Sequence, residues 1–394
     1  CLLHEKPFAG VNGSGKHNNW SLTTDDGINL LNPGASPHDN VQFLLVLACI
    51  LKAVDVHADL LRESASDVGN DSRLGGNEAP PAIISVFLGD QLEDVISQLC
   101  DTGEATHSKQ GGTLKTGVAM LPDLDQDVTD RNRTSPFAFT NNKFEFRMVG
   151  SSDSVSPANV VLNTIVAEAF KEAADELEKA DDFQLAVHDM IKKLLTEHRR
   201  IIFNGNGYSK SWVKEAARRG LPNISCMVEA IPALTTEKAV KLFETFHVYT
   251  KAELESRAEV EYDSYAKIVH IEALAMTNIA GKQIIPAIIR YTARLADSMA
   301  KVQSVCPEAE ISVQRDLLLE ASRRLSEIKA AHSKLVELQD ECKSIRSAKE
   351  RAIACRERLV PAMEELRRPV DLLERIVDKD LWPMPSYGDL LFEV

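Results

Sequence analysis

The hydrophobic pattern of the chain changes at about residue 160, and this change constrains the fold more than any other feature. Before it, short alternating runs are broken by clusters of Gly, Pro, Asn and Asp, which predicts strands and loops with a few helices. After it, stretches rich in Ala, Glu, Leu and Lys predict helices. A strand-rich part followed by a helical part indicates an α+β fold.

Three helical blocks are expected after residue 160. The first runs from Val160 to Leu195. The second begins in the segment YSKSWVKEAARRG, where Ser209 is a candidate N-cap and Gly220 a candidate C-terminal stop. The third extends from about Thr236 to Ser304.

Apolar residues between Ser326 and Leu366 follow a heptad register that Lys349 and Arg356 interrupt. About three uninterrupted heptads favour an antiparallel helical hairpin or a packed bundle helix over a long free coiled coil. The register positions are Ile328, Ala331, Leu335, Leu338, Cys342, Ile345, Ala352, Leu359, Met363 and Leu366.

Composition narrows the classes of function. With 394 residues and 44% hydrophobic content, the chain suits a soluble globular protein with room for two domains. A net charge of -14 repels phosphate backbones, so we expect no nucleic-acid partner. The longest apolar run, Phe43 to Leu51, is far shorter than the roughly 20 residues that span a bilayer, so no membrane helix is expected. Seven scattered cysteines without C-x-x-C spacing fit a reducing compartment.

The segment GVNGSGKH, residues 10–17, differs from a phosphate-binding P-loop because His17 stands where Ser or Thr would bind magnesium. The following HNNWSLT favours an extended chain over the helix that a P-loop needs. On a strand, His17, Asn19 and Ser21 would share one face. An imidazole beside glycines is a candidate metal-and-substrate site, with an ordinary surface histidine as the alternative.

Charged residues also follow the strand pattern in NKFEFRMVGS, where Lys143, Glu145 and Arg147 would lie opposite an aromatic core face. The upstream TDRNRTSPF adds Arg131 and Arg133. Arginines gathered in an acidic protein suggest a bound anion such as phosphate or carboxylate. The alternative is a solvent-facing strand with cross-strand ion pairs.

A third stretch, SRLGGNEAPPAIISVFLG, sets Glu78 between a Gly-Gly hinge and a Pro-Pro pair, shortly after Arg73. A carboxylate between a flexible and a rigid element can close over a site. An ordinary turn is the alternative.

In this order, the three stretches resemble glutamine synthetase, and the type III form in particular. KPFAGVNGSGKHNNWSL resembles the N-G-S-G-x-H segment, RLGGNEAPPAI resembles the P-G-x-E-A-P flap, and DRNRTSPFAFTNNKFEFRMVGS resembles the N-R-S segment joined to R-x-E-x-R. The last residues, DKDLWPMPSYGDLLFEV, resemble the C-terminus of the type III chain. The resemblance covers essentially all 394 residues.

The resemblance implies an α+β fold. Residues 1–195 would form the C-terminal part of a catalytic domain, whose antiparallel sheet lines an active-site funnel, and residues 196–394 a helical C-terminal domain of the type III proteins. It also implies a ring-shaped homo-oligomer, in double rings. The heptad helices would then be inter-subunit or inter-ring contacts, although packing within one chain explains their periodicity equally well.

The implied activity is that of a glutamate–ammonia ligase. It amidates L-glutamate with ammonium and ATP through a γ-glutamyl phosphate, uses Mg²⁺ or Mn²⁺, and serves nitrogen assimilation. The phosphoryl step gathers negative charge, which metals and arginines offset. A cytoplasmic location is expected, or a plastid if the source is eukaryotic.

The resemblance also implies roles for single residues on the phosphate side of the site. His17 and Glu145 would ligate the metal nearer the ATP phosphates. Arg133 would neutralise the phosphates being transferred. Ser21 and Lys143 would lie on the nucleotide side.

On the amino-acid side, the resemblance implies that Asn12 and Gly13 contact glutamate, Gly13 through its backbone. Arg73 and Arg147 would hold glutamate carboxylates. Glu78 would shield the intermediate and take a proton from ammonium, since a carboxylate on a closing flap both excludes water and acts as a base.

Two residues depart from the pattern of other types, Asn19 where they have a second histidine and Ala138 where they have a further arginine. The family's other metal-ligand glutamates and a β-grasp-like domain precede the point where this chain begins, at Cys1. We therefore expect these 394 residues alone to make no glutamine. The alternative function is a truncated or non-catalytic glutamine synthetase-like subunit that acts in assembly or regulation.

Overall fold

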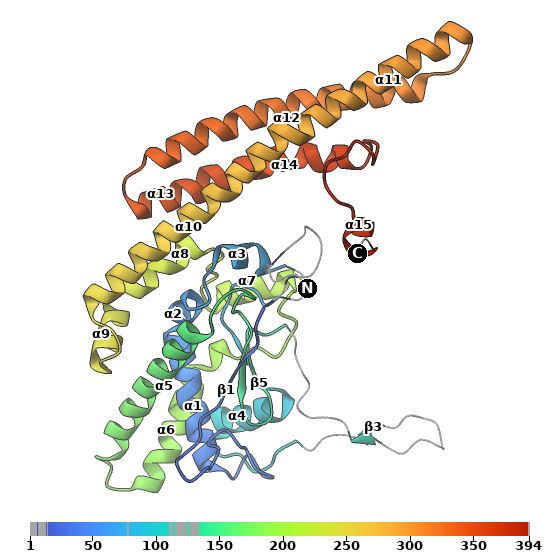
Figure 1. Cartoon of the computed structure of the whole chain (residues 1–394). Helices are drawn as coiled ribbons and strands as arrows, with labels where there is room; N and C mark the ends of the chain where they lie inside the picture. The colour runs from blue at the N-terminus through green and yellow to red at the C-terminus, as the bar shows by residue number, and fades with distance from the viewer. Residues whose placement is uncertain are drawn as a thin grey trace. The chain divides into compact units, whose positions relative to one another are not determined.

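The computed structural model describes residues 6, 13, 15–76, 79–109, 113–114, 124–125 and 134–392. The chain divides into two compact units, Cys1–Ala258 and Glu259–Val394. The described strands all lie in the first unit together with helices, whereas the described elements of the second unit are all helical (Figure 1). The predicted α+β class is confirmed.

The elements of the first unit follow one another along the chain. They are β1 (Asn18–Trp20), α1 (Val41–Val56), α2 (Ala58–Glu63), α3 (Val68–Arg73), β2 (Val86–Phe87), α4 (Asp90–Thr102), β3 (Thr113–Leu114), β4 (Leu124–Asp125), β5 (Phe137–Phe139), β6 (Phe144–Phe146), α5 (Ser156–Leu177), α6 (Phe183–Glu197), the 3₁₀ turn η1 (Arg199–Ile201), α7 (Lys210–Arg218), α8 (Met227–Ala230), the 3₁₀ turn η2 (Ile231–Thr235) and α9 (Glu237–Thr245).

The central sheet of the first unit has the strand order β1-β6-β5-β2. β6 runs antiparallel to both β1 and β5, whereas β2 pairs with β5 in parallel. The family resemblance had led us to expect an antiparallel sheet. The sheet is instead mixed, because β2 pairs with β5 in parallel. Parallel strands need a long connection, and here it contains α4 and the chain up to residue 136.

Aromatic side chains of β5 and β6 form the centre of this unit's core. Phe137 and Phe144 are stacked with ring centroids 4.6 Å apart, and Phe139 lies 5.8 Å from Phe43 of α1. Helix α1, which contains the longest apolar run, packs in turn against α5 and α6 (Figure 1). Among the described residues, no helix is long and apolar enough to cross a membrane.

The predicted helix ends around Ser209 and Gly220 are confirmed. The side chain of Ser209 accepts a hydrogen bond from the backbone N–H of Trp212 at 3.2 Å and so caps α7. Gly220 has a φ of +72°, the left-handed conformation that ends many helices. Helix α6 runs across the position between residues 195 and 196, where we placed the domain boundary. The expected domain boundary stays a prediction.

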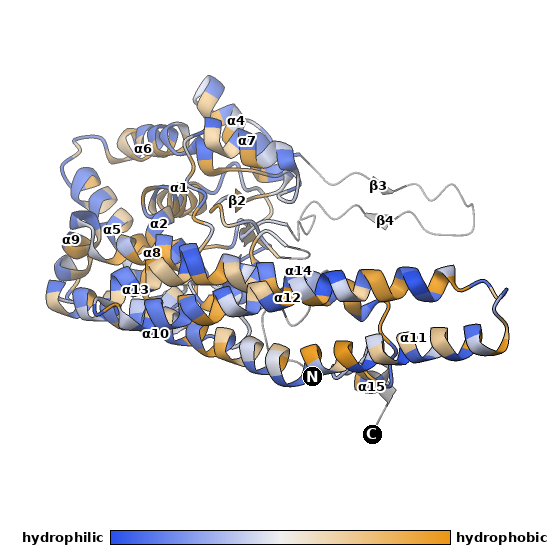
Figure 2. Cartoon of the chain, turned by 90° about the horizontal axis from the view of Figure 1, so that it is seen from above, coloured by the Kyte–Doolittle hydropathy of each residue, from blue (hydrophilic) through white to orange (hydrophobic). Residues whose placement is uncertain are grey.

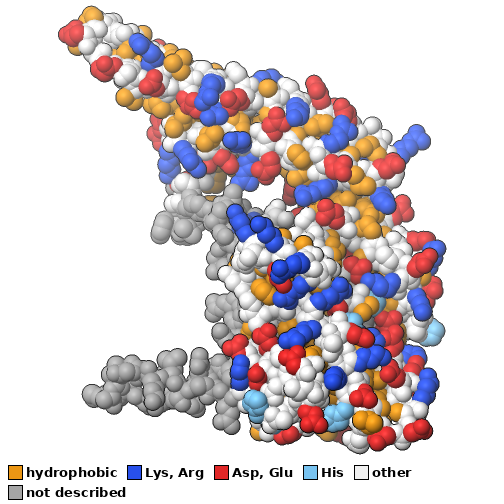
Figure 3. All heavy atoms as spheres, turned by 180° about the vertical axis from the view of Figure 1, so that it is seen from behind, with side chains coloured by type: hydrophobic (Ala, Val, Ile, Leu, Met, Phe, Trp, Pro, Cys, Tyr) orange, Lys and Arg blue, Asp and Glu red, His pale blue; other side chains and the backbone are white. Residues whose placement is uncertain are grey.

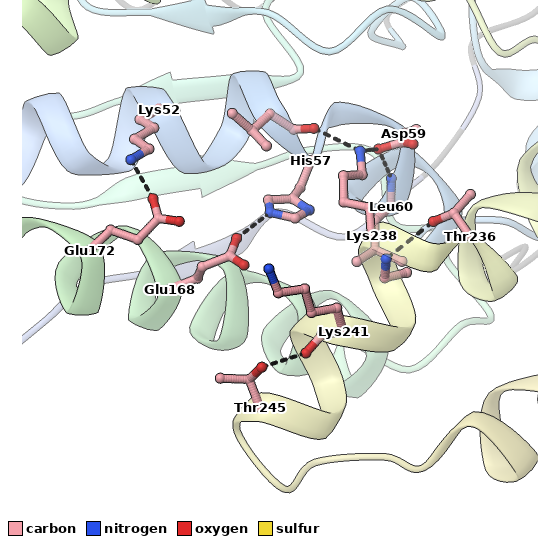
Figure 4. A network of polar contacts seen from close by, with 12 residues as sticks. Lys52, His57, Asp59, Leu60, Glu168, Glu172, Thr236, Lys238, Lys241 and Thr245 are labelled. Atoms are coloured by element: carbon pink, nitrogen blue, oxygen red, sulfur yellow. Dashed lines mark hydrogen bonds and ion pairs between the residues drawn. The ribbon is translucent and has the colours of Figure 1, made fainter.

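A polar network links the end of α1 to α5 and α9 (Figure 4). His57, which follows α1, is buried, and its Nε2 lies 2.6 Å from Oε2 of Glu168 on α5. Lys52 forms an ion pair with Glu172, one turn further along α5. The hydrogen bond from His57 is the largest cause that lowers the pKa of Glu168, and the charges of Lys52 and Lys241 add to it.

We expect Glu168→Gln to lower the free energy of unfolding by about 1–2 kcal/mol at neutral pH, because a hydrogen bond to a charged group is lost. A carboxyl whose pKa is lowered by folding stabilises the fold above its ordinary pKa of about 4.3. This stabilisation disappears as the pH falls through the lowered pKa, so the difference from the wild type should shrink in acid. Urea unfolding at several pH values measures it. A difference that stays constant would contradict the prediction, and the more exposed Glu172→Gln is the control.

The second unit consists of long helices. Helix α10 (Lys251–Ile279) begins before its boundary, and the elements that follow are the π-helical turn η3 (Ala280–Ile284), α11 (Ile285–Val305), α12 (Ser312–Ser344), α13 (Ala348–Ala354), the π-helical turn η4 (Cys355–Leu359), α14 (Val360–Glu374) and α15 (Tyr387–Phe392).

The predicted helical hairpin is confirmed in this unit. Helix α12 packs against both α11 and α14, and hydrophobic residues recur along these helices (Figure 2). The chain reverses between the end of α12 at Ser344 and the start of α13 at Ala348. Heptad positions on both arms, such as Leu335 and Leu366, are at most 1% exposed. The heptad pattern therefore reports packing within one chain.

Candidate active site

Two neighbouring strands bring His17 and Glu145 together. β1 and β6 pair so that Asn19 lies opposite Glu145, and His17 directly precedes β1. The Nδ1 atom of His17 is 3.6 Å from Oε2 of Glu145. The histidine side chain is 56% exposed, whereas that of Glu145 is only 4% exposed. The imidazole nitrogen of the exposed His17 therefore lies close to a carboxylate oxygen of the buried Glu145.

The alternation predicted along β1 is confirmed. His17, Asn19 and Ser21 are exposed, whereas Asn18 and Trp20 are buried. The two buried side chains donate hydrogen bonds of 2.8 and 2.9 Å to asparagines of α5. The strand is thus anchored by one face and presents the other, polar face.

Glu145 and Arg147 form a buried ion pair on β6 and the residue after it. Nη2 and Nε of Arg147 lie 3.0 and 3.2 Å from Oε2 of Glu145. Neither residue is more than 3% exposed, whereas Lys143 on the same face is half-buried. The alternative of a solvent-facing strand is therefore wrong for this pair. Burying two charges is costly unless their geometry is good, and here two nitrogens of one guanidinium face the same carboxylate oxygen.

Arg73, the last residue of α3, is buried next to the chain that carries Arg147. Its Nη2 donates to the carbonyl of Arg147 at 2.9 Å, and its Nη1 donates to the carbonyl of Met148 at 3.0 Å. Asn70, one turn earlier, accepts from Nη1 of Arg73 and donates to the same Met148 carbonyl. Helix α3 therefore holds the backbone at the end of β6. The role in glutamate binding that we expected for Arg73 stays a prediction.

Gly15 leaves room for the guanidinium of Arg73. An ideal Cβ at Gly15 would overlap both Cζ and Nη2 of Arg73. The glycine is bridged to Gly150, and the next residue, Lys16, donates its N–H to the carbonyl of Val149 at 2.9 Å. The second glycine of the GSG sequence is thus explained by a close approach to Arg73.

We expect Gly15→Ala to lower the free energy of unfolding by about 1–3 kcal/mol, because the added methyl group must displace an anchored guanidinium. In an Arg73→Ala background the same change should cost much less, since the overlap is removed. Equilibrium unfolding of the four proteins in this cycle measures both values. Gly388→Ala, whose Cβ would have an ordinary contact only, is the control. Equal costs in both backgrounds would contradict this explanation.

Ser21 lies beside two adjoining hollows of the first unit. Its Oγ is 3.1 Å from both Oδ1 of Asn29 and the carbonyl of Asn142. Asn142 lines one hollow, of about 340 Å³, and Asn29 lines the other, of about 440 Å³. Lys143 follows Asn142 directly. Amide-rich hollows of this size suit a polar small molecule.

Two donor atoms that suit a divalent metal lie close together in the described part of the chain. An imidazole nitrogen and a carboxylate oxygen, from His17 and Glu145, suit such an ion. No group of three or more His, Cys, Asp or Glu side chains that could hold a metal occurs among the described residues.

Comparisons with known proteins agree on one family. Residues 186–303 match the family model described as the glutamine synthetase C-terminal domain. Over 100% of its length, the chain is 43% identical to the type-3 glutamine synthetase of Dictyostelium discoideum, of which it covers 54%. It is 40% identical to the glutamine synthetase of Bacteroides fragilis (strain YCH46), over 99% of the chain and 55% of that protein. It is 39% identical to the glutamine synthetase of Butyrivibrio fibrisolvens, over 100% of the chain and 56% of that protein.

The chain belongs to the glutamine synthetase family. It spans about half the length of the curated relatives that it matches, and it corresponds to their C-terminal portion.

Several residues to which the glutamine synthetase resemblance assigns a role lie outside the described residues. These are Asn12, Glu78 and Arg133, together with the neighbouring Arg131. Gly13 is described and is half-buried. Because glycine has no side chain, its expected contact with glutamate would come from the backbone. The roles of these residues stay predictions.

A glycine-rich loop between η1 and α7 holds Thr134, the residue that follows Arg133. The N–H of Gly207 donates to Oγ1 of Thr134 at 2.8 Å, and a Cβ at Gly207 would overlap the Thr134 carbonyl. Oδ1 of Asn204 accepts from the N–H of Leu88 at 2.9 Å, which ties the loop to the end of β2. Our reading of the sequence missed this loop. Its signal was the glycine-rich FNGNG between two predicted helices.

Proposed function

We propose that the full-length protein is a glutamate–ammonia ligase, which forms glutamine from L-glutamate, ammonium and ATP in nitrogen assimilation. The observation that supports this most is the exposed His17 above the buried Glu145–Arg147 pair, in a chain of the glutamine synthetase family. A subunit that acted only in assembly would have no physical need to bury an ion pair below an imidazole.

The first chemical step in this proposal activates a poor electrophile. A carboxylate resists attack by ammonia, so the γ-carboxylate of glutamate first takes the terminal phosphoryl group of ATP and becomes an acyl phosphate. Mg²⁺ or Mn²⁺ held by His17 and Glu145 would supply positive charge at the phosphates. Arg133 would add a second positive charge there, and Glu145 would also orient Arg147 through their ion pair.

Substrate binding in this proposal is divided between residues that contact glutamate and residues that contact the nucleotide. Asn12, Gly13 and Arg147 would contact glutamate. Arg73 would act there too, and its hydrogen bonds support a further role in positioning Arg147. Ser21 and Lys143, beside the amide-lined hollows, would contact the nucleotide.

The second step in this proposal needs uncharged ammonia and a site without water. Glu78 would accept a proton from ammonium, which leaves a nitrogen lone pair to attack the acyl carbon and release phosphate. The same flap would keep water from the acyl phosphate, since hydrolysis would waste ATP.

An activity assay of the full-length protein tests the proposal. Glutamine should form only when ATP, glutamate, ammonium and a divalent metal are all present. Residues 1–394 expressed alone should form none, because the family resemblance places the other metal-ligand glutamates in the part of the relatives that this chain does not cover. A full-length protein that stays inactive but changes the activity or assembly of another glutamine synthetase would support the alternative, a regulatory subunit.

We also propose that the full-length protein forms a homo-oligomer, arranged in rings. Heptad residues of the second unit pack against one another within the chain. Contacts between subunits would therefore involve other faces of these helices. Large apolar side chains are exposed on these helices, among them Ile271 at 64%, Ile289 at 52% and Leu319 at 62%. Apolar side chains are visible between charged ones along these helices (Figure 3). Contiguous exposed apolar patches mark protein–protein contacts, and we propose that these side chains contribute to one.

We expect the double variant Ile271→Asp/Leu319→Asp to dissociate the full-length oligomer, because each charge would be buried in a contact. Size exclusion with light scattering measures the mass. The control exchanges exposed polar residues of the same helices, Asn278→Asp/Ser322→Asp. An unchanged mass of the first variant would remove these helices from the interface.

A further inference from the structure

A third hollow of the first unit, of about 390 Å³, lies beyond the β2 edge of the sheet, at the opposite edge from β1. Its wall includes Ile202, which is bridged in parallel to Val86 of β2. Residues of α4 form the other side. Three of the lining residues are Arg199, Arg200 and Arg219. We call this feature the arginine hollow.

One wall of the arginine hollow, residues 199–219, is basic, whereas the α4 wall carries the acidic residues Asp90, Glu93, Asp94 and Asp101. The net charge of the chain is -14, yet residues 199–219 contain six Lys or Arg residues and one Glu. A concentrated positive segment on an acidic protein attracts anions locally. Arginine, with five N–H donors in a planar fork, is the side chain best suited to hold phosphate or carboxylate groups.

Arg200 is anchored by one edge only. Its Nε donates to both carboxylate oxygens of Asp55, at 2.9 and 3.1 Å. Asp55 is buried and is also held by Nδ1 of His198 at 2.8 Å. The two terminal nitrogens of Arg200 have no hydrogen-bond partner among the described residues, and the side chain is 47% exposed. A fixed guanidinium with an open terminal edge is preorganised for a bidentate anion.

Arg219 is held still more firmly. Its Nε donates to Glu215 at 2.9 Å, and its Nη1 donates to the carbonyl of Ile202 at 2.8 Å. Its Cζ lies 5.5 Å from the ring centroid of Trp212, which is stacked on Phe203 at 3.6 Å. These contacts fix the position of the cation before any ligand binds.

Arg199 is the third arginine of the arginine hollow, and its guanidinium can exchange an exposed ion-pair partner for a bound anion. Its Nη2 donates to Oγ of Ser97 at 3.0 Å, while its Nη1 is 3.5 Å from the 67% exposed Asp101. An exposed ion pair of this kind contributes little and can be exchanged for a stronger anion. Glu93, a carboxylate of the lining, accepts a hydrogen bond from Asn204 at 2.7 Å and could accept another from a ligand hydroxyl.

We propose that the arginine hollow binds a small organic polyanion, whose phosphate or carboxylate groups are held by Arg199, Arg200 and Arg219. The volume suits a metabolite-sized molecule. The site lies at the opposite sheet edge from the candidate active site and does not depend on the proposed ligase activity. A bound anion would join α4, η1 and the end of α7, and would therefore stabilise the folded protein.

Isothermal titration calorimetry of the full-length protein with pyrophosphate and with citrate, at constant ionic strength, tests the proposal. We expect saturable binding of at least one probe, weakened about tenfold or more in Arg199→Gln/Arg200→Gln, because two charge-assisted contacts are lost. The two probes distinguish a phosphate ligand from a carboxylate ligand. Asp55 keeps His198 as a partner in this variant, so the fold should persist.

The matched control is Lys214→Gln/Arg218→Gln, which removes the same charge from α7 outside the lining of the hollow. It should bind the probes as the wild type does. Binding that is absent for both probes, unaffected by Arg199→Gln/Arg200→Gln, or weakened equally by the control would overturn the proposal. If the double variant does not fold, Arg200→Lys keeps the charge but not the bidentate fork, and it should weaken binding about threefold or more.

Discussion

His17→Ala in the full-length protein is expected to lower glutamine formation about 100-fold or more at limiting metal, while the free energy of unfolding stays nearly unchanged. The side chain is 56% exposed, and its removal leaves Glu145 paired with Arg147. The loss should therefore appear in the metal dependence. Rates measured over a range of Mg²⁺ and Mn²⁺ concentrations, together with urea unfolding, separate the two effects.

Glu145→Gln is the contrasting variant. It should cause a similar or larger loss of activity, and in addition lower the free energy of unfolding by about 3–5 kcal/mol, because the charge of Arg147 stays buried without its carboxylate. If His17→Ala and Glu145→Gln lowered the free energy of unfolding equally, the role of His17 would be structural. Full activity of His17→Ala at low metal concentration would remove it from the metal site.

Glu78→Ala should uncouple the two steps of the proposed reaction. Without the carboxylate, deprotonation of ammonium slows and water reaches the acyl phosphate. Glutamine formation should fall about 10²–10⁴-fold, while phosphate release falls much less. Affinity for ATP should change little, because the residue is proposed to act after phosphoryl transfer.

The ratio of phosphate to glutamine, measured on the same samples, is the decisive quantity for Glu78→Ala. It should stay close to one in the wild type and rise well above one in the variant. Glu104→Ala, an exposed carboxylate after α4, is a control of equal charge. A ratio unchanged in Glu78→Ala would show that the flap carboxylate neither activates ammonium nor excludes water.

Much of the helical architecture could be predicted, because its signals are local. The cap at Ser209 and the stop at Gly220 depend on hydrogen bonds and dihedral angles within a few residues. The heptad pattern predicted a hairpin because α12 and α14 bury the same stripe that the register marks. The parallel pairing of β2 with β5 could not be predicted in this way, since strands of two or three residues carry almost no pairing signal.

The sequence predicted which strand faces carry residues of the candidate site, but it did not predict how the strands are arranged relative to one another. Alternation placed His17 on one face of β1 and Glu145 on one face of β6. It did not show that the two strands are neighbours, nor that Glu145 is buried. The overlap that a Cβ at Gly15 would make with Arg73 joins residues far apart in the sequence. No local pattern reports such a contact.

By itself, the sequence determined the α+β class, the helix ends, the hairpin, the family and the residue types that suit metal and phosphate chemistry. These depend on local hydrogen bonding, on periodicity and on ordered motifs. The tertiary structure alone decided which residues meet. It set His17 at 3.6 Å from Glu145, buried the Glu145–Arg147 pair, held Thr134 with Gly207 and gathered three arginines beyond β2. Burial and charge pairing depend on strand order and packing between distant segments, and these exist only in the folded chain.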